Sequence, residues 1–265
     1  MRLAAFQPTR HSRALHKVPS HHILAPVAVA ALLFGALVTD AMAQAPAVAS
    51  APAPAPAAAA PEMKPLGGER YQIGNIVVDR KARQMTIPAR VHIVDKPLEY
   101  LLTTRGGMKE YESLLETDVT GTELNLACIL LGLERDKTQD PYLQFSQKRV
   151  SGSRVDIMLR RKYGDRTTSV PAADVLFDSG QKAPEPVEWV YTGSLKHVQD
   201  DDRFGADVTG TLIGFVHDPN TIIESALGLG IGAYGSVNGN TALLPPTGAN
   251  VDLVITVPKG SAGKK

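Results

Sequence analysis

The stretch Tyr111–Leu133 constrains the fold most strongly, because it joins a short strand to the most apolar helix outside the N-terminal region. Thr120 and Glu123 have the spacing of a capping box, in which each side chain accepts the backbone N–H of the other residue. Apolar residues then recur at helical spacing up to Gly132, which can end a helix without a Cβ penalty. A helix of about three turns is too short to be stable alone. We therefore predict that it packs against a sheet in the centre of the core.

Residues 1–43 have the pattern of a secretory signal peptide. The first 39 residues carry four basic and no acidic side chains, the run Ile23–Val38 is apolar, and Ala41-Met42-Ala43 matches the small-x-small cleavage site. We expect cleavage before Gln44 and export to the periplasm or the extracellular space. An uncleaved membrane anchor is disfavoured, because the apolar run is shorter than the roughly 20 residues of a spanning helix and contains a proline. No membrane span is therefore expected in the exported chain.

Three segments follow the signal peptide. Residues 44–67 are rich in alanine and proline, which predicts an extended spacer with no core of its own. Residues 68–258 are long enough for a single domain with one core. Residues 259–265 are predicted to form a disordered tail.

Charge and cysteine content limit the possible partners. The chain has 28 basic and 27 acidic residues, and removal of residues 1–43, with four basic and one acidic residue, leaves a net charge of −2. A near-neutral chain without a basic stripe argues against nucleic acid as a partner. The single cysteine, Cys128, excludes an internal disulfide and is interpreted as a small buried apolar residue. The partners left open are another envelope protein or a small ligand.

The pattern of apolar residues predicts a β-rich α+β fold. A second short helix is predicted at Pro219–Leu227, opened by Asp218 or Asn220. The predicted strands are Ile76–Asp79, Met85–Val94, Leu98–Thr103, Tyr111–Glu116, Val155–Arg160, Val187–Thr192, Thr211–Val216 and Val251–Val257.

An internal similarity indicates a repeat. Pro97–Thr103 resembles Pro186–Thr192, and at the same spacing the pentapeptide Asp118–Thr122 recurs unchanged as Asp207–Thr211. Matching blocks in the same order predict two duplicated β-α halves in one domain, at about residues 86–160 and 169–256. Chance similarity among short β segments is the alternative.

Several motifs in order resemble the YdjY domain family. They are Glu112-Ser113-Leu114-Leu115, the helix that ends at Gly132, Trp189-Val190-Tyr191-Thr192-Gly193-Ser194 and Asp207-Val208-Thr209-Gly210. The resemblance implies a secreted or envelope-anchored bacterial protein and no established activity. Tyr111 stands where the family pattern often has histidine, so a histidine-based role is not carried over to this chain.

Five polar residues are candidates for a ligand site. Glu112 and Ser113 precede a helix N-terminus, whose dipole favours an anion. They can equally be polar positions on a half-buried strand. Thr192 and Ser194 flank a glycine and can present hydroxyls to a ligand, or can simply end a strand in a turn. Asp207 is the fifth candidate.

No metal or other cofactor is predicted. Asp200-Asp201-Asp202 suggests Ca²⁺ but lacks the spacing of an EF-hand, which favours a solvated acidic loop. Gly230–Gly235 matches the dinucleotide fingerprint without the strand and helix that the fingerprint requires. The histidines match no zinc spacing, and the common hydrolase and redox motifs are absent from the sequence.

Two functions are therefore compared. The first is a non-enzymatic envelope module that binds a partner protein or a small ligand in a groove. The second is an enzyme with an unfamiliar site, which requires Glu112, Ser113, Ser194 and Asp207 to meet in one pocket.

Overall fold

The computed structural model describes residues 61–195, 203–230 and 234–260. The predicted signal peptide 1–43, most of the predicted linker 44–67 and the acidic triplet Asp200–Asp202 lie outside these ranges. The helices of the described residues are α1 (Gly121–Leu130), α2 (Gly205–Thr209) and a 3₁₀ turn at Glu110–Glu112. The strands are β1 (Met63–Gly67), β2 (Arg70–Ile73), β3 (Ile76–Asp79), β4 (Gln84–Val91), β5 (Tyr100–Thr104), β6 (Ser113–Thr117), β7 (Ser153–Tyr163), β8 (Arg166–Pro171), β9 (Leu176–Asp178), β10 (Ala183–Pro184), β11 (Trp189–Tyr191), β12 (Thr211–Gly214), β13 (Ile223–Ser225), β14 (Val237–Gly239) and β15 (Asn250–Thr256).

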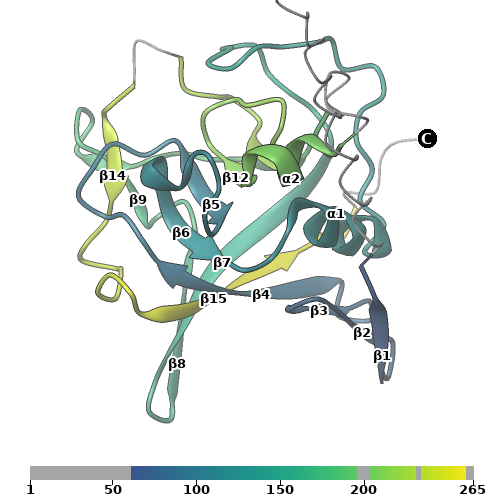
Figure 1. Cartoon of the computed structure of the whole chain (residues 1–265). Coiled ribbons are helices and arrows are strands. Elements are labelled where there is room, and N and C mark those ends of the chain that lie inside the picture. The colour runs from purple at the N-terminus through teal and green to yellow at the C-terminus, as the bar shows by residue number, and fades with distance from the viewer. Residues whose placement is uncertain (1–60, 196–202, 231–233, 261–265) are drawn as a thin grey trace, which may run out of the picture. The chain divides into compact units, whose positions relative to one another are not determined.

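Eight strands of the main sheet form a closed barrel (Figure 1). Their order is β4-β15-β7-β11-β13-β12-β5-β6, and β6 pairs back to β4. Neighbours are antiparallel except for the parallel pairs β5–β6 and β12–β13. Strands β1 to β3 extend the sheet from β4, and β8 extends it from β7. A second sheet has the order β10-β9-β14.

The barrel is covered unevenly. Strand β4 alternates between buried and more exposed residues, with Met85, Ile87, Ala89 and Val91 on its buried face. Such alternation is typical of a strand with one face in the core and one in solvent. Every residue of β6, β12 and β13 is buried instead. Both helices contact β12, and α1 also contacts β2 and β3, which continue the sheet from β4.

The predicted helix after the strand is confirmed. Thr120 Oγ1 accepts the backbone N–H of Glu123 at 3.2 Å, and Glu123 Oε2 accepts that of Thr120 at 2.8 Å, which completes the capping box. Gly132 follows the helix with φ +78°, the left-handed conformation expected of a C-terminal glycine. Leu124, Ala127 and Cys128 are buried, and the helix contacts β2, β3 and β12. Cys128 is therefore the small buried residue that the sequence predicts.

The prediction of an α+β fold with two duplicated β-α halves is wrong, because the described residues form a β-rich closed barrel. The closed barrel takes strands from the whole domain, and the two α-helices of the described residues fall at unrelated points. The repeated pentapeptide shows why, because Thr120 begins α1 whereas its counterpart Thr209 ends α2 and Gly210 follows with φ +74°. The second predicted helix is also absent, since β13 occupies part of Pro219–Leu227. Identical local sequence was overridden by tertiary context.

A different relation exists among the strands themselves. Strands β4, β5, β6 and β7 occupy places in the ring equivalent to those of β11, β12, β13 and β15, including the two parallel pairs. Leu115 pairs with Leu102 of β5 as Ile223 pairs with Ile213 of β12, so Glu116 of β6 and Glu224 of β13 are equivalent positions. The helices do not follow this relation, because α1 succeeds β6 whereas α2 precedes β12.

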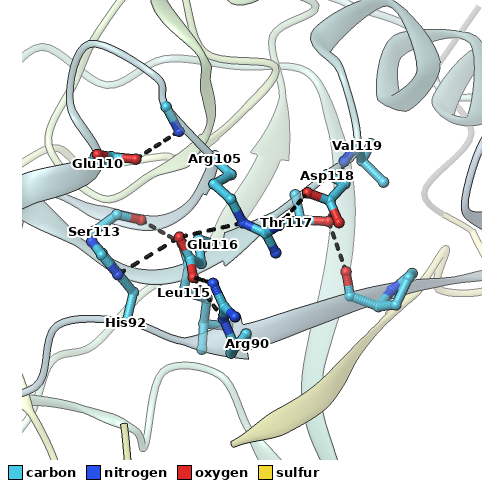
Figure 2. Close-up of polar contacts among 12 residues, drawn as sticks. Arg90, His92, Arg105, Glu110, Ser113, Leu115, Glu116, Thr117, Asp118 and Val119 are labelled. Atoms are coloured by element: carbon cyan, nitrogen blue, oxygen red, sulfur yellow. Dashed lines mark hydrogen bonds and ion pairs between the residues drawn. The ribbon is translucent and has the colours of Figure 1, made fainter. Parts of the chain in front are cut away.

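The barrel closes at a short seam between β4 and β6 (Figure 2). Arg90 pairs with Glu116 across the seam, and Arg90 Nε donates to Glu116 Oε1 at 2.7 Å. Arg105 Nε lies 3.8 Å and His92 Nδ1 lies 3.7 Å from Glu116 Oε2. Glu116 is only 5% exposed, so its charge depends on these basic neighbours rather than on water. Arg105 also binds the exposed carboxylate of Asp118 at 2.9 Å.

Glu116→Gln should lower the free energy of unfolding by about 2 kcal/mol, because it removes the charged partner of a half-buried arginine at the seam. The matched control is Asp118→Asn, whose side chain is 58% exposed and whose ion pair is worth about 0–1 kcal/mol. Urea denaturation of both variants measures the difference. Equal losses in the two variants would show that the Glu116 ion pairs do not hold the seam.

Candidate functional site

An open cleft of about 1360 Å³ lies beside the end of α1. Its walls come from α1, from the segment after it, from the start of β7, from the end of β11 and from Phe204 before α2. We call residues 133–142 the strap, because this segment borders the cleft along its length. The lining residues are Asn125, Ile129, Leu133, Glu134, Arg135, Asp136, Lys137, Gly152, Ser153, Tyr191, Gly193, Ser194 and Phe204.

A smaller cleft of about 380 Å³ continues the first. The two share Arg135, Asp136, Lys137 and Ser194 in their walls. The second adds further strap residues, Ser151, Thr192, Leu195 and Pro219. We refer to both together as the strap cleft.

Local backbone requirements place the strap against β7. Arg135 and Gly152 form an isolated antiparallel bridge, and the N–H of Ser153 donates to the carbonyl of Glu134 at 3.0 Å. A Cβ at Gly152 would lie 2.0 Å from the carbonyl oxygen of Tyr191, a distance that no side chain can occupy. Glycine at this position therefore lets the strap, β7 and β11 meet at the base of the cleft.

The charged groups of the strap differ in their partners. Asp136 accepts hydrogen bonds from Thr138 and from the Ser151 hydroxyl, and these bonds hold the pKa of its carboxyl below the usual range. Among the described residues, Arg135 and Lys137 have no ion-pair partner. Tyr191 Oη donates to Asn125 Oδ1 at 2.7 Å. Burial raises the pKa of the Tyr191 hydroxyl, and the nearby Arg135 guanidinium acts in the opposite direction.

A buried carboxyl lies behind the smaller cleft. Glu224 is fully buried, and Tyr142 of the strap donates its hydroxyl to Glu224 Oε2 at 2.9 Å. The N–H of Asp218 donates to Oε1 at 2.9 Å, and the Thr221 hydroxyl donates to the same oxygen. No basic side chain of the described residues pairs with Glu224, unlike its equivalent Glu116 in the ring. Burial raises the pKa of Glu224 to about 8.

Two further buried carboxyls, those of Glu99 and Glu112, share one lysine. Glu112 is one of the predicted site residues. Lys109 Nζ lies 2.8 Å from Glu112 and 3.5 Å from Glu99. Tyr234 donates its hydroxyl to Glu112 at 2.9 Å, and the Gln144 amide donates to Glu99 at 3.3 Å. Burial, followed by the charge of Glu112, raises the pKa of Glu99 to about 7. The bond from Gln144 joins the loop after the strap to the barrel.

The five predicted site residues fall into separate places. Thr192 and Ser194 line the strap cleft. Asp207 on α2 accepts from the backbone N–H of Thr122 at 2.9 Å and so links the two helices. Glu112 belongs to the buried carboxyl pair, and Ser113 is fully buried with its hydroxyl donated to Leu115 (Figure 2). No hydrogen bond or ion pair within the described ranges connects Glu112 or Ser113 to Ser194 or Asp207.

Sequence reasoning missed the residues that give the strap cleft its chemistry. Arg135, Lys137 and Asn125 belong to no recognisable motif. The course of the strap brings Arg135 and Lys137 to the cleft, where Asn125 of α1 also lies. Glu224 did have a signal, since it is the single charged residue in the otherwise uncharged run Thr221–Leu229. A lone carboxyl in such a run predicts either a solvent-facing position or a buried acid.

The structure adds two observations on ions and membranes. Within the described ranges, no group of three or more histidine, cysteine, aspartate or glutamate side chains could hold a metal ion. The acidic triplet Asp200–Asp202 and part of the glycine loop Gly230–Gly235 lie outside those ranges. None of the helices among the described residues has the length and apolar character needed to cross a membrane.

Comparison with known proteins identifies a family. The model of the YdjY domain matches residues 76–256, which is more than half of the chain. The match spans β3 to β15, which includes all eight barrel strands, and the whole strap cleft. No curated protein matches the chain, and no solved structure matches it.

Glu224 should make the stability of the protein depend on pH. The folded carboxyl keeps its proton up to about pH 8, whereas the unfolded one loses it near the ordinary value of 4.5. The folded state thus binds more protons between these values, so stability falls as the pH rises through this window. Glu224→Gln should reduce that fall, measured by thermal unfolding at several pH values. The control is Glu188→Gln, which changes a half-exposed carboxylate paired with Arg149. This variant should lose stability with rising pH as much as the wild type does. An equal effect of the two variants would contradict this role for Glu224.

Proposed function

The chain belongs to the YdjY domain family, and on that premise we propose that it is an exported, non-enzymatic envelope module that binds a ligand in the strap cleft. Export is supported by the basic start, apolar run and cleavage pattern of residues 1–43. The alanine- and proline-rich segment 44–67 supports a domain held on a spacer.

The strap cleft is the observation that carries the binding function. The two connected clefts, of about 1360 and 380 Å³, are large enough for a small ligand, since ligand pockets measure about 300–1,000 Å³. Apolar residues such as Ile129, Leu133 and Phe204 share the lining with charged and hydroxyl groups. Ligand sites typically combine an apolar lining with a few placed polar groups.

The enzymatic alternative has less support from the geometry. A nucleophilic hydroxyl needs a base within hydrogen-bond reach and access to substrate. The Ser113 hydroxyl is buried and bonded to a backbone carbonyl. Ser194 Oγ accepts the N–H of Ala206 at 3.1 Å, which ties it to the start of α2. Both hydroxyls are therefore used to hold the fold.

Blocking the strap cleft should abolish ligand binding without unfolding the protein. Ile129 is 55% exposed on α1 and lines the cleft, so Ile129→Trp places a bulky ring there at little cost to the core. Leu143→Trp is the matched control, because Leu143 is 80% exposed and lies outside the lining. A set of small aromatic acids, amides and sugars should shift the backbone NMR signals of Gly152 and Ser153 in the wild type and the control, and not in Ile129→Trp.

Two results would contradict the binding proposal. One is that these compounds shift no signal of the cleft residues at any concentration below their solubility. The other is that Ile129→Trp binds them as well as Leu143→Trp does.

A further inference from the structure

We propose that the ligand of the strap cleft carries a carboxylate, and that the Arg135 guanidinium is the group that binds it. This inference rests on the proposed function, since it names the class of ligand for the same site. It follows from which hydrogen-bonding groups of the cleft are already used and which are not.

Arg135 extends along the neighbouring ends of β7 and β11. Its backbone is fixed beside β7 by the bridge to Gly152, while its Cδ lies 3.6 Å from the position of a Cβ at Gly193, just after β11. The Tyr191 hydroxyl is close to the same point, at 3.2 Å. Within the described part of the chain, the guanidinium has no hydrogen bond and no ion pair. Its five N–H donors are therefore available in a fork that fits a planar carboxylate.

Asn125 adds donors on the same side. Its carbonyl oxygen accepts the Tyr191 hydroxyl at 2.7 Å, which fixes the orientation of the amide. The NH₂ group of Asn125 then has no partner among the described residues and supplies two more donors. The Lys137 ammonium, likewise without an ion pair there, adds positive charge to the same wall.

The acceptors of the cleft are largely used. Asp136 accepts from Thr138 and from Ser151 at 2.6–2.8 Å. Ser153 Oγ accepts the N–H of Glu134 at 2.9 Å, and Ser194 Oγ accepts that of Ala206. The carboxylates of Glu134 and Asp140 are the exceptions among the described residues, and both are exposed on the strap.

The unused hydrogen-bonding groups close to Tyr191 and Gly193 are therefore the donors of Arg135 and Asn125. A ligand with a carboxylate pairs with this guanidinium through charge-assisted hydrogen bonds, which a neutral or basic ligand cannot form. The apolar side chains of Ile129, Leu133 and Phe204 in the same lining suit an apolar body attached to that carboxylate.

The test compares benzoate with benzamide, which has nearly the same shape but no charge. Each compound is titrated into the full chain and followed by the NMR signals of Arg135, Gly152 and Gly193. Benzoate should bind at least about 10-fold more tightly than benzamide, because hydrogen bonds to a charged group are worth about 1.5–3 kcal/mol. Added salt should reduce the difference.

Arg135→Gln should bring benzoate binding down to the level of benzamide and leave benzamide binding unchanged. Arg149→Gln is the matched control, because Arg149 lies outside the lining and pairs with Glu188. Equal binding of benzoate and benzamide to the wild type, or full benzoate binding by Arg135→Gln, would overturn the inference and leave the binding function standing. Failure of both compounds to shift the cleft signals would overturn the inference together with the proposed function.

Discussion

The closure of the barrel between β4 and β6 is the constraint on which the rest of the structure depends. Only two residue pairs join these strands, at Arg90–Glu116 and Val91–Leu115. The seam brings a nearly buried carboxylate to a point where three basic side chains surround it. A buried charge is tolerated when it is paired and hydrogen-bonded. The ion pairs of Glu116 therefore make a short strand contact compatible with a closed ring.

The same ring contains a second buried carboxyl that has no basic side chain beside it among the described residues. Glu224 is equivalent to Glu116 in the strand arrangement, but tyrosine, threonine and a backbone N–H take the place of the arginines. Its raised pKa is the physical consequence of burial without a cation. The Tyr142 hydroxyl connects this carboxyl to the strap, so the wall of the cleft is tied to the interior of the barrel. The cleft itself lies beside the start of β7, where the strap pairs with Gly152 just before that strand.

Local signals were sufficient for much of the fold. The capping residues Thr120 and Glu123 defined α1, and runs of β-branched and alternating residues located β3, β4, β7 and β15. Barrel closure could not be predicted, because it depends on pairings between residues far apart in sequence that share no local pattern. The repeat of Asp118–Thr122 was misleading for the same reason, since its two copies take different structures. The cleft was predicted only at Thr192 and Ser194, because Arg135 reaches it through the path of the strap.

Residue-resolved amide hydrogen exchange would test the closed barrel most directly. The amides of His92 and Ile93 donate across the seam to Leu114 and Ser113, at 2.8 and 3.3 Å. If the eight strands form one closed unit, these amides should exchange only through global unfolding, with the same opening free energy as the amides of β15. Exchange of the seam amides at a clearly lower opening free energy than those of β15 would contradict the account, because it would show an open sheet whose edges meet only transiently.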